Sequence, residues 1–324
     1  MELAITIVLF LVGLGLIIKG GDIFVDAATW AADISGIPKF VIGATVVSFA
    51  TTLPELLVSI FAAFDGKVDI AIGNAVGSVT ANTGMIMAIS MICLPSLARR
   101  KSIGFKAILM IIAIGGLFFF SIDGRLGLIE SVVLLALFAI NMYESIKQGK
   151  TGTIAKKLEE KVSVTRRDVL VNAFKFVLGT AGIVVGADML VDYGSEIARA
   201  FGVSEAVIGS TLIAVGTSLP ELVTTITAIA KKEASLSIGN IIGANVIDIT
   251  LILPLCALFS GKPIPVQGQN LYLDIPGCLI IGCIALIPIL IRQKYTRALG
   301  LIVLAAYSGY IYFVISGNYP VPLL

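Results

Sequence analysis

Long apolar runs separated by short polar segments cover most of this 324-residue chain. Several runs reach the roughly 20 residues that a helix needs to cross a bilayer. The pattern predicts ten spans, at about 3–20, 39–64, 70–95, 104–121, 126–146, 168–190, 205–230, 236–259, 271–291 and 298–316. The first and the sixth span continue into amphipathic extensions. We therefore expect an all-α integral membrane protein with ten transmembrane helices.

One long polar stretch, KQGKTGTIAKKLEEKVSVTRR at 147–167, separates two halves of five spans each. Because five is an odd number, the second half must enter the membrane from the side opposite to the first. Inverted repeats of this kind are typical of secondary transporters, whose sites lie near the midplane where the copies meet. We expect a first five-helix repeat at 1–146, a cytoplasmic linker at 147–167 and a second five-helix repeat at 168–324.

The two halves repeat each other without a gap. Residues 43–55 read GATVVSFATTLPE and residues 209–221 read GSTLIAVGTSLPE, at an offset of 221 − 55 = 166. At the same offset, GNAVGSVTAN at 73–82 matches GNIIGANVID at 239–248. These four segments are the expected ion-site motifs of the two repeats.

Composition limits the chemistry that the chain can perform. Hydrophobic residues make up 57% and charged residues 14%, whereas a soluble domain carries roughly 25% charge. Histidine is absent, which removes the commonest transition-metal ligand and neutral-pH proton shuttle. The four cysteines lack metal-ligand spacing and are expected to be buried structural thiols. We expect no cofactor and no nucleic acid partner.

Basic residues gather in alternate loops and in the central linker, which also favours ten spans. By the positive-inside rule, both termini lie outside and the central loop is cytoplasmic in a multi-pass protein of the plasma membrane. The lysines of the linker are free to contact anionic lipid.

The TTLPE and TSLPE segments each place a glutamate, Glu55 or Glu221, directly after a proline. Proline cannot donate a backbone hydrogen bond, so each one frees a carbonyl inside the membrane. Hydroxyl-bearing residues stand beside each break: Thr51, Thr52, Thr217 and Ser218. Carbonyl, hydroxyl and carboxylate oxygens are the ligands of hard cations, and calcium takes 6–8 of them. Because ionisable residues inside a bundle are functional by default, the pattern predicts a cation site.

The glycine-rich motifs add polar groups to this site. Their glycines have the small-xxx-small spacing of closely packed helices. At helical spacing Ser78 and Asn82 share one face, as do Ala244 and Asp248, and we expect these faces to lie toward the glutamates. Other acids lie near span ends: Asp22, Asp26, Asp188 and Asp192 are expected to have an interfacial structural role, and Asp274 and Glu130 to be solvated or to snorkel to the interface.

This combination of motifs resembles the sodium/calcium exchangers of the calcium/cation antiporter superfamily, in their short prokaryotic form, over nearly the whole chain. The resemblance implies that Glu55 and Glu221 are the calcium carboxylates, completed by the backbone carbonyls of Thr51 and Thr217. It further implies sodium ligands and residues lining the centre of the site, namely Ser78, Ser218, Thr52, Asn82 and Asp248.

Departures from the family pattern concern the counter-ion. Ala244 stands where the family often has a serine, and we hypothesise that Ser48 supplies the missing hydroxyl. We interpret the chain as a secondary antiporter in the lipid bilayer that exchanges sodium for calcium by alternating access and extrudes calcium. A proton/calcium antiporter remains an alternative, although the GN motifs carry no acid. Potassium co-transport is a second alternative, because potassium-dependent exchangers resemble this chain in carrying an acid at the position of Asp248.

Two other classes are weighed as well. An intramembrane enzyme could use two acids that share a proton, but the chain has no nucleophile motif or substrate domain to support it. A passive channel usually places its site on an oligomer axis, whereas this chain carries both halves of its own site. We therefore expect a transporter and not an enzyme.

Overall fold

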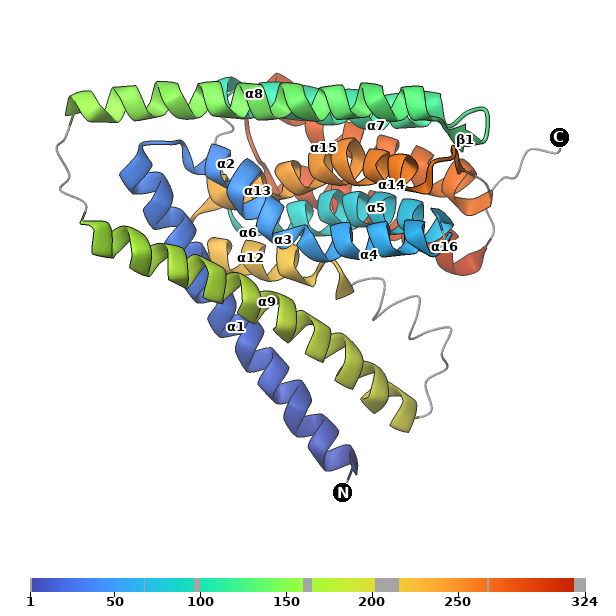
Figure 1. Ribbon diagram of the computed structural model, residues 1–324, viewed down its shortest axis with the longest axis horizontal. Helices are drawn as coiled ribbons and strands as arrows, with labels where there is room; N and C mark the ends of the chain where they lie inside the picture. The colour runs from blue at the N-terminus through green and yellow to red at the C-terminus, as the bar shows by residue number, and fades with distance from the viewer. Residues whose placement is uncertain are drawn as a thin grey trace.

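The computed structural model describes residues 2–66, 68–95, 100–159, 165–201, 216–266 and 268–317. Helices form nearly all of this part of the chain, and several of them contain a π-helical segment (η), a wider turn with i→i+5 hydrogen bonds. Figure 1 shows α8 along one side of a bundle of helices, with α1 and α9 crossing on the opposite side.

The described elements of the first half, with the strand that ends the loop before α8, are α1 (Glu2–Ser35), α2 (Lys39–Ile42), η1 (Gly43–Val47), α3 (Ser48–Thr51), α4 (Leu53–Phe64), α5 (Val68–Ala81), η2 (Asn82–Met87), α6 (Ala88–Cys93), α7 (Arg100–Phe120), β1 (Arg125–Leu126) and α8 (Leu128–Glu159). Those of the second half are α9 (Arg166–Ala200), α12 (Leu219–Ala230), α13 (Ala234–Ile247), η4 (Asp248–Ile252), α14 (Leu253–Ser260), β2 (Ile264–Pro265), η5 (Asn270–Asp274), α15 (Ile275–Arg292) and α16 (Arg297–Ser316). The strands β1 and β2 pair antiparallel and tie two loops at one end of the bundle.

The apolar spans agree with these elements. In the described residues, 8 helices are long and apolar enough to cross a membrane, and a bent pair, Lys39–Thr51 with Leu53–Phe64, makes a ninth span with a 47° bend. The shorter apolar helix Leu219–Ala230 follows residues 202–215, so the start of the expected seventh span and motif residues 209–215 lie outside the described residues. Helix α8 extends to Glu159, well into the segment expected to be a linker.

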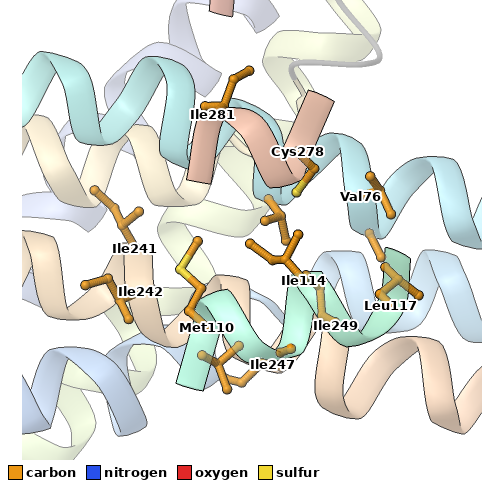
Figure 2. Close-up of a cluster of buried hydrophobic side chains, with 14 of the residues drawn as sticks. Val76, Met110, Ile114, Leu117, Ile241, Ile242, Ile247, Ile249, Cys278 and Ile281 are labelled. Atoms are coloured by element: carbon orange, nitrogen blue, oxygen red, sulfur yellow. The ribbon is translucent and has the colours of Figure 1, made fainter. Parts of the chain in front are cut away.

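The core lies where α5, α7, α13 and α15 meet. Figure 2 shows Val76, Met110, Ile241 and Ile281, one from each of these four helices, among the buried side chains of this core. All of them are buried, and α13 is buried along nearly its whole length. Because an intramembrane helix that is covered all round cannot face lipid, α5 and α13 carry their polar motif residues inside the bundle.

Helices α1 and α9 cross at glycines that are equivalent in the repeat, since 186 − 20 = 166. A Cβ on Gly20 would lie 2.8 Å from the backbone nitrogen of Ile183, and one on Gly186 would lie 2.7 Å from that of Ile17. The two backbones therefore touch directly, as small residues permit between membrane helices. This pair forms a unit apart from the core, which it meets through α12 and the broken second span.

Candidate functional site

The two proline motifs form the same helix break in both repeats. Thr52 has φ −86° and ψ 2°, and Ser218 has φ −87° and ψ 2°, so each begins a new helix, α4 or α12. The proline occupies the second position of that helix, where a missing N–H is tolerated. Glu55 and Glu221 then lie in the first turn, where the helix dipole favours a negative charge.

Three carboxylates are buried together without a basic partner. Glu55, Glu221 and Asp248 are each 0% exposed. Both side-chain oxygens of Glu55 and Asp248, and Oε2 of Glu221, accept no hydrogen bond, and within the described part of the chain no ion pair reaches any of the three. Their charges act on one another. Because burying an unpaired charge is costly, these carboxylates need bound cations or protons to balance their charge.

Hydroxyl and amide groups connect the two repeats around these acids. Thr52 Oγ1 donates to Glu221 Oε1 at 3.4 Å, and the hydroxyls of Ser78 and Ser218 are 3.3 Å apart. Asn82 Nδ2 donates to Ser78 Oγ at 3.4 Å, while its Oδ1 has no partner. The expected residues of the first and second halves therefore meet at one place.

Asn82 and Asp248 occupy equivalent positions at which the helix changes geometry. Asn82 begins η2 and Asp248 begins η4. Such π-helical segments often accompany functional sites, because the extra residue leaves backbone groups without their usual partners. The structure thus brings the expected central residues to a local irregularity in both copies.

The two copies differ at the asparagine of the GN motif. Asn74 Nδ2 donates to the carbonyl of Glu55 at 3.3 Å and to Ser59 Oγ at 3.0 Å. Its equivalent, Asn240, instead accepts from Thr51 Oγ1 at 3.2 Å, and Asn240 Nδ2 is unpaired. Thr51 is therefore closed in against α13.

Thr217 has a different environment from its counterpart Thr51. It is half-buried and lines a cavity of about 230 Å³ together with Pro54, Pro220, Asp188 and Asp192. Thr51 is 2% exposed. A cavity therefore lies beside the helix break of the second repeat, whereas the break of the first repeat is covered by packed residues.

Ser48 is buried, but its hydroxyl does not contact the three acids. It donates to the carbonyl of Thr45 at 3.1 Å and lies against Gly243, where an added Cβ would be 2.5 Å away. The Ser48 carbonyl accepts from the hydroxyls of Thr51 and Thr52. Ser48 therefore stabilises the helix break through its carbonyl, and its hydroxyl contacts Gly243, the neighbour of Ala244 in the sequence. Its repeat partner, Ala214, is outside the described residues.

Two residues near the site were not among the expected ligands. Thr224 and Thr225 are fully buried, and their hydroxyls have no partner. They follow Glu221 by three and four positions and so share its helix face, a signal that the sequence did contain. Asp274, expected to be solvated, is 6% exposed and accepts from Tyr310 Oη at 2.8 Å; a partner 36 positions away gave no local signal.

The donor set suits a cation that accepts mixed oxygen ligands. In the described residues, no three His, Cys, Asp or Glu side chains come close enough to hold one metal ion. A divalent cation here would therefore combine carboxylates with hydroxyl, amide and carbonyl oxygens, which calcium accepts in irregular geometry.

Comparison with known proteins decides the family. A family model described as "Sodium/calcium exchanger protein" matches residues 5–147 and 171–316. The chain belongs to the sodium/calcium exchanger family. Membership in this family makes it a multi-pass membrane protein and a transporter.

Relatives of the family match along nearly the whole chain. An uncharacterized membrane protein of Methanocaldococcus jannaschii is 34% identical over 301 residues, covering 92% of this chain and 94% of that protein. The sodium/calcium exchanger MaX1 of Methanosarcina acetivorans is 29% identical over 345 residues, covering 95% and 98%.

A solved structure agrees as well. The sodium-calcium exchanger NCX_Mj, soaked with 10 mM Na+ and 10 mM Sr2+, matches with a TM-score of 0.83 and 31% identity, covering 96% of this chain and 98% of that one. The expected architecture, ten transmembrane helices in two inverted five-helix repeats, is confirmed by this match.

Proposed function

We propose that this protein is a secondary active antiporter that exchanges sodium for calcium by alternating access and extrudes calcium from the cell. The observation that carries this proposal is the burial of Glu55 and Glu221 at equivalent helix breaks with no basic partner. Two facing carboxylates balance one divalent cation or more than one monovalent cation. A single pocket can then hold either ion in turn, which is the electrostatic requirement for exchange.

In this proposal, calcium binds between the carboxylates of Glu55 and Glu221, with the backbone carbonyls of Thr51 and Thr217 as further ligands. Both glutamates stand in the first turn of a helix, so their side chains are held by short, rigid segments. The oxygens of Glu55 are unpaired and free to coordinate.

Sodium binds to overlapping groups. The proposed sodium ligands are hydroxyls from both motifs, Ser78, Ser218 and Thr52, with Asn82 and Asp248 lining the centre. The hydroxyl contacts between Ser78 and Ser218, and between Thr52 and Glu221, support this overlap. Because the two ions compete for the same carboxylates, neither binds fully while the other is present.

Coupling requires that the ion-loaded protein can switch between its two faces and that the empty, charged site switches poorly. Helices α1 and α9, packed on each other through glycines, are the unit that we propose moves over the core. We further propose, from the positive-inside rule, that both termini lie outside the plasma membrane and the central loop lies in the cytoplasm.

Calcium-45 uptake into proteoliposomes tests the proposal, with sodium, potassium and pH gradients imposed one at a time. We expect an outward sodium gradient to drive uptake and a pH gradient without sodium to leave it at background. Uptake driven by the pH gradient alone would instead identify a proton/calcium antiporter, and uptake independent of every counter-ion gradient would identify a channel.

One observation favours a second candidate, a potassium-dependent exchanger. Asp248 adds a third buried carboxylate, and neither of its oxygens has a partner. A third negative charge offers room for one more monovalent cation. Sodium-driven uptake that rises on adding potassium on the calcium side would support this candidate.

A further inference from the structure

The inverted repeat makes it possible to compare the two routes to the site residue by residue. The cavity beside Thr217 is lined by Asp188 and Asp192 of α9 and by Val58 of α4. At the repeat offset, 188 − 22 = 166, their equivalents are Asp22 and Asp26 of α1 and Thr224 of α12. If the two faces were alike, these equivalents would line a matching cavity beside Thr51.

Instead, α1 is packed against α12 at this place. A Cβ on Gly21 would lie 2.8 Å from Thr227 Oγ1. Val25 and Thr224 are fully buried, and the Thr224 hydroxyl has no hydrogen-bond partner. An unpaired buried hydroxyl is costly. In the other repeat the equivalent residue, Val58, lines the cavity between α4 and α9. If α1 moved away from α12 in the same way, water could reach the Thr224 hydroxyl. The closed face is thus built from the same positions that line the cavity on the other face.

A lysine holds this closed face together. Lys231 Nζ lies 2.6 Å from Asp26 Oδ1 and 3.6 Å from Asp22 Oδ1, and it also donates to the Asp22 carbonyl at 3.2 Å. Lys231 directly follows α12, the helix that begins at the break before Glu221. Its side chain is 26% exposed. The ammonium therefore ties α1 to the far end of the helix that carries a site carboxylate.

In the other repeat, the position equivalent to Lys231 carries an acid instead of a base. The equivalent of Lys231 is Asp65, since 231 − 166 = 65. An aspartate cannot provide the positive charge that would hold Asp188 and Asp192 of α9. The two repeats therefore differ in sequence at the position that provides the ion pair, Lys231 in one and Asp65 in the other.

We propose that Lys231 is a positioning residue that latches α1 onto α12 through Asp22 and Asp26, and so biases the protein toward the conformation open beside Thr217. The latch rests on the proposed alternating access, because it must open in each cycle for the site to reach the other face. A partly exposed ion pair has the appropriate strength: it shifts a two-state population by about threefold, which sets a preference without preventing the change.

Hydrogen–deuterium exchange of the full chain in lipid nanodiscs tests the latch. In Lys231→Gln we expect peptides of α1 around 18–28 and of α12 around 222–231 to exchange about threefold faster. Peptides of α9 around 185–195 should exchange more slowly, because the cavity beside Thr217 closes as the population shifts. Lys231→Arg should behave as the parent. Lys232→Gln is the matched control, because no ion pair of Lys232 is seen in the described residues.

The reciprocal change separates a latch from a local packing role. Faster exchange in α1 and α12 without slower exchange in α9 would overturn the latch, as would unchanged exchange in Lys231→Gln. This measurement does not need transport. A failure of sodium-driven calcium uptake would contradict the proposed function while leaving the exchange result to decide the latch.

Discussion

Thr52 Oγ1 donates a 3.4 Å hydrogen bond to Glu221 Oε1, so the first residue of one helix break touches the carboxylate that follows the other. The Thr52 hydroxyl shares its single proton with the Ser48 carbonyl of its own span, which is 2.6 Å away. The hydroxyl thus links the backbone of the first repeat to an acid of the second. Together with the contact between the hydroxyls of Ser78 and Ser218, it joins the two helix breaks across the repeats.

Removing this link tests its role in cation binding. Thr52→Val keeps the shape of the side chain but removes the hydroxyl, and we expect about a fivefold loss of sodium affinity, which corresponds to the roughly 1 kcal/mol of a typical hydrogen bond. Thr52→Ser, which copies the residue at the equivalent Ser218, should keep the parent affinity. Sodium titration of calcium uptake measures both. Equal affinities in the two variants would contradict a ligand role for this hydroxyl.

Neutralising either glutamate should stop exchange. We expect Glu55→Gln and Glu221→Gln each to lower sodium-dependent calcium-45 uptake by at least about 100-fold, because calcium loses one of the two charges that balance it. The control is Glu130→Gln, a change at an acid in the first turn of α8. Robust uptake by both glutamine variants, in protein that runs as a single species, would refute the site assignment.

Asp248 separates the counter-ion hypotheses. In Asp248→Asn the second repeat acquires the residue of the first, Asn82, and the site loses one of its three buried carboxylates. We expect calcium uptake to persist with about one fewer positive charge moved in exchange, and any stimulation by potassium to disappear. Uptake at varied membrane potential and potassium concentration measures this. A charge stoichiometry that is the same in parent and variant would exclude Asp248 from ion binding.

Ser48 is the proposed source of the hydroxyl that Ala244 lacks. We expect Ser48→Ala to lower sodium affinity about threefold, the effect of one weak ligand or hydrogen bond, while calcium affinity stays the same. Its hydroxyl already donates to the carbonyl of Thr45, so the oxygen remains free to accept or coordinate. Unchanged sodium affinity in this variant would contradict the hypothesis that Ser48 supplies the hydroxyl missing at Ala244.

Much of the fold followed from the sequence because lipid imposes simple rules. The length of the apolar runs predicted the spans, the fixed repeat offset identified the two halves, and the odd number of spans in each half predicted their inversion. The helix ends were harder: α8 continues to Glu159, because a charged helix end that leaves the membrane has no apolar limit to mark it. Residue pairs within one motif were also visible, since Asn82 reaches Ser78 one turn away.

Features that depend on the conformation of the whole protein were not visible. Thr51 and Thr217 are equivalent in sequence, yet one is hydrogen-bonded to Asn240 and the other lines a cavity. Asp274 is buried by Tyr310, which comes from a different helix. Two equivalent motifs can have different environments because each packs against different neighbours in the folded protein, and the sequence of a motif does not specify those neighbours.

The glycine crossing of α1 and α9 offers a prediction on stability. Gly20→Ala places a Cβ within 2.9 Å of the Gly179 carbonyl oxygen, a backbone atom that cannot move aside alone. Such overpacking costs about 1–3 kcal/mol, so the midpoint of thermal unfolding in detergent should fall by several degrees and transport should slow. Gly15→Ala is the matched control on the same helix, since nothing lies within 4 Å of its added Cβ. That variant should keep the parent midpoint or exceed it, because alanine favours a helix over glycine. Equal midpoints in the two variants would mean that α1 and α9 do not pack through this crossing.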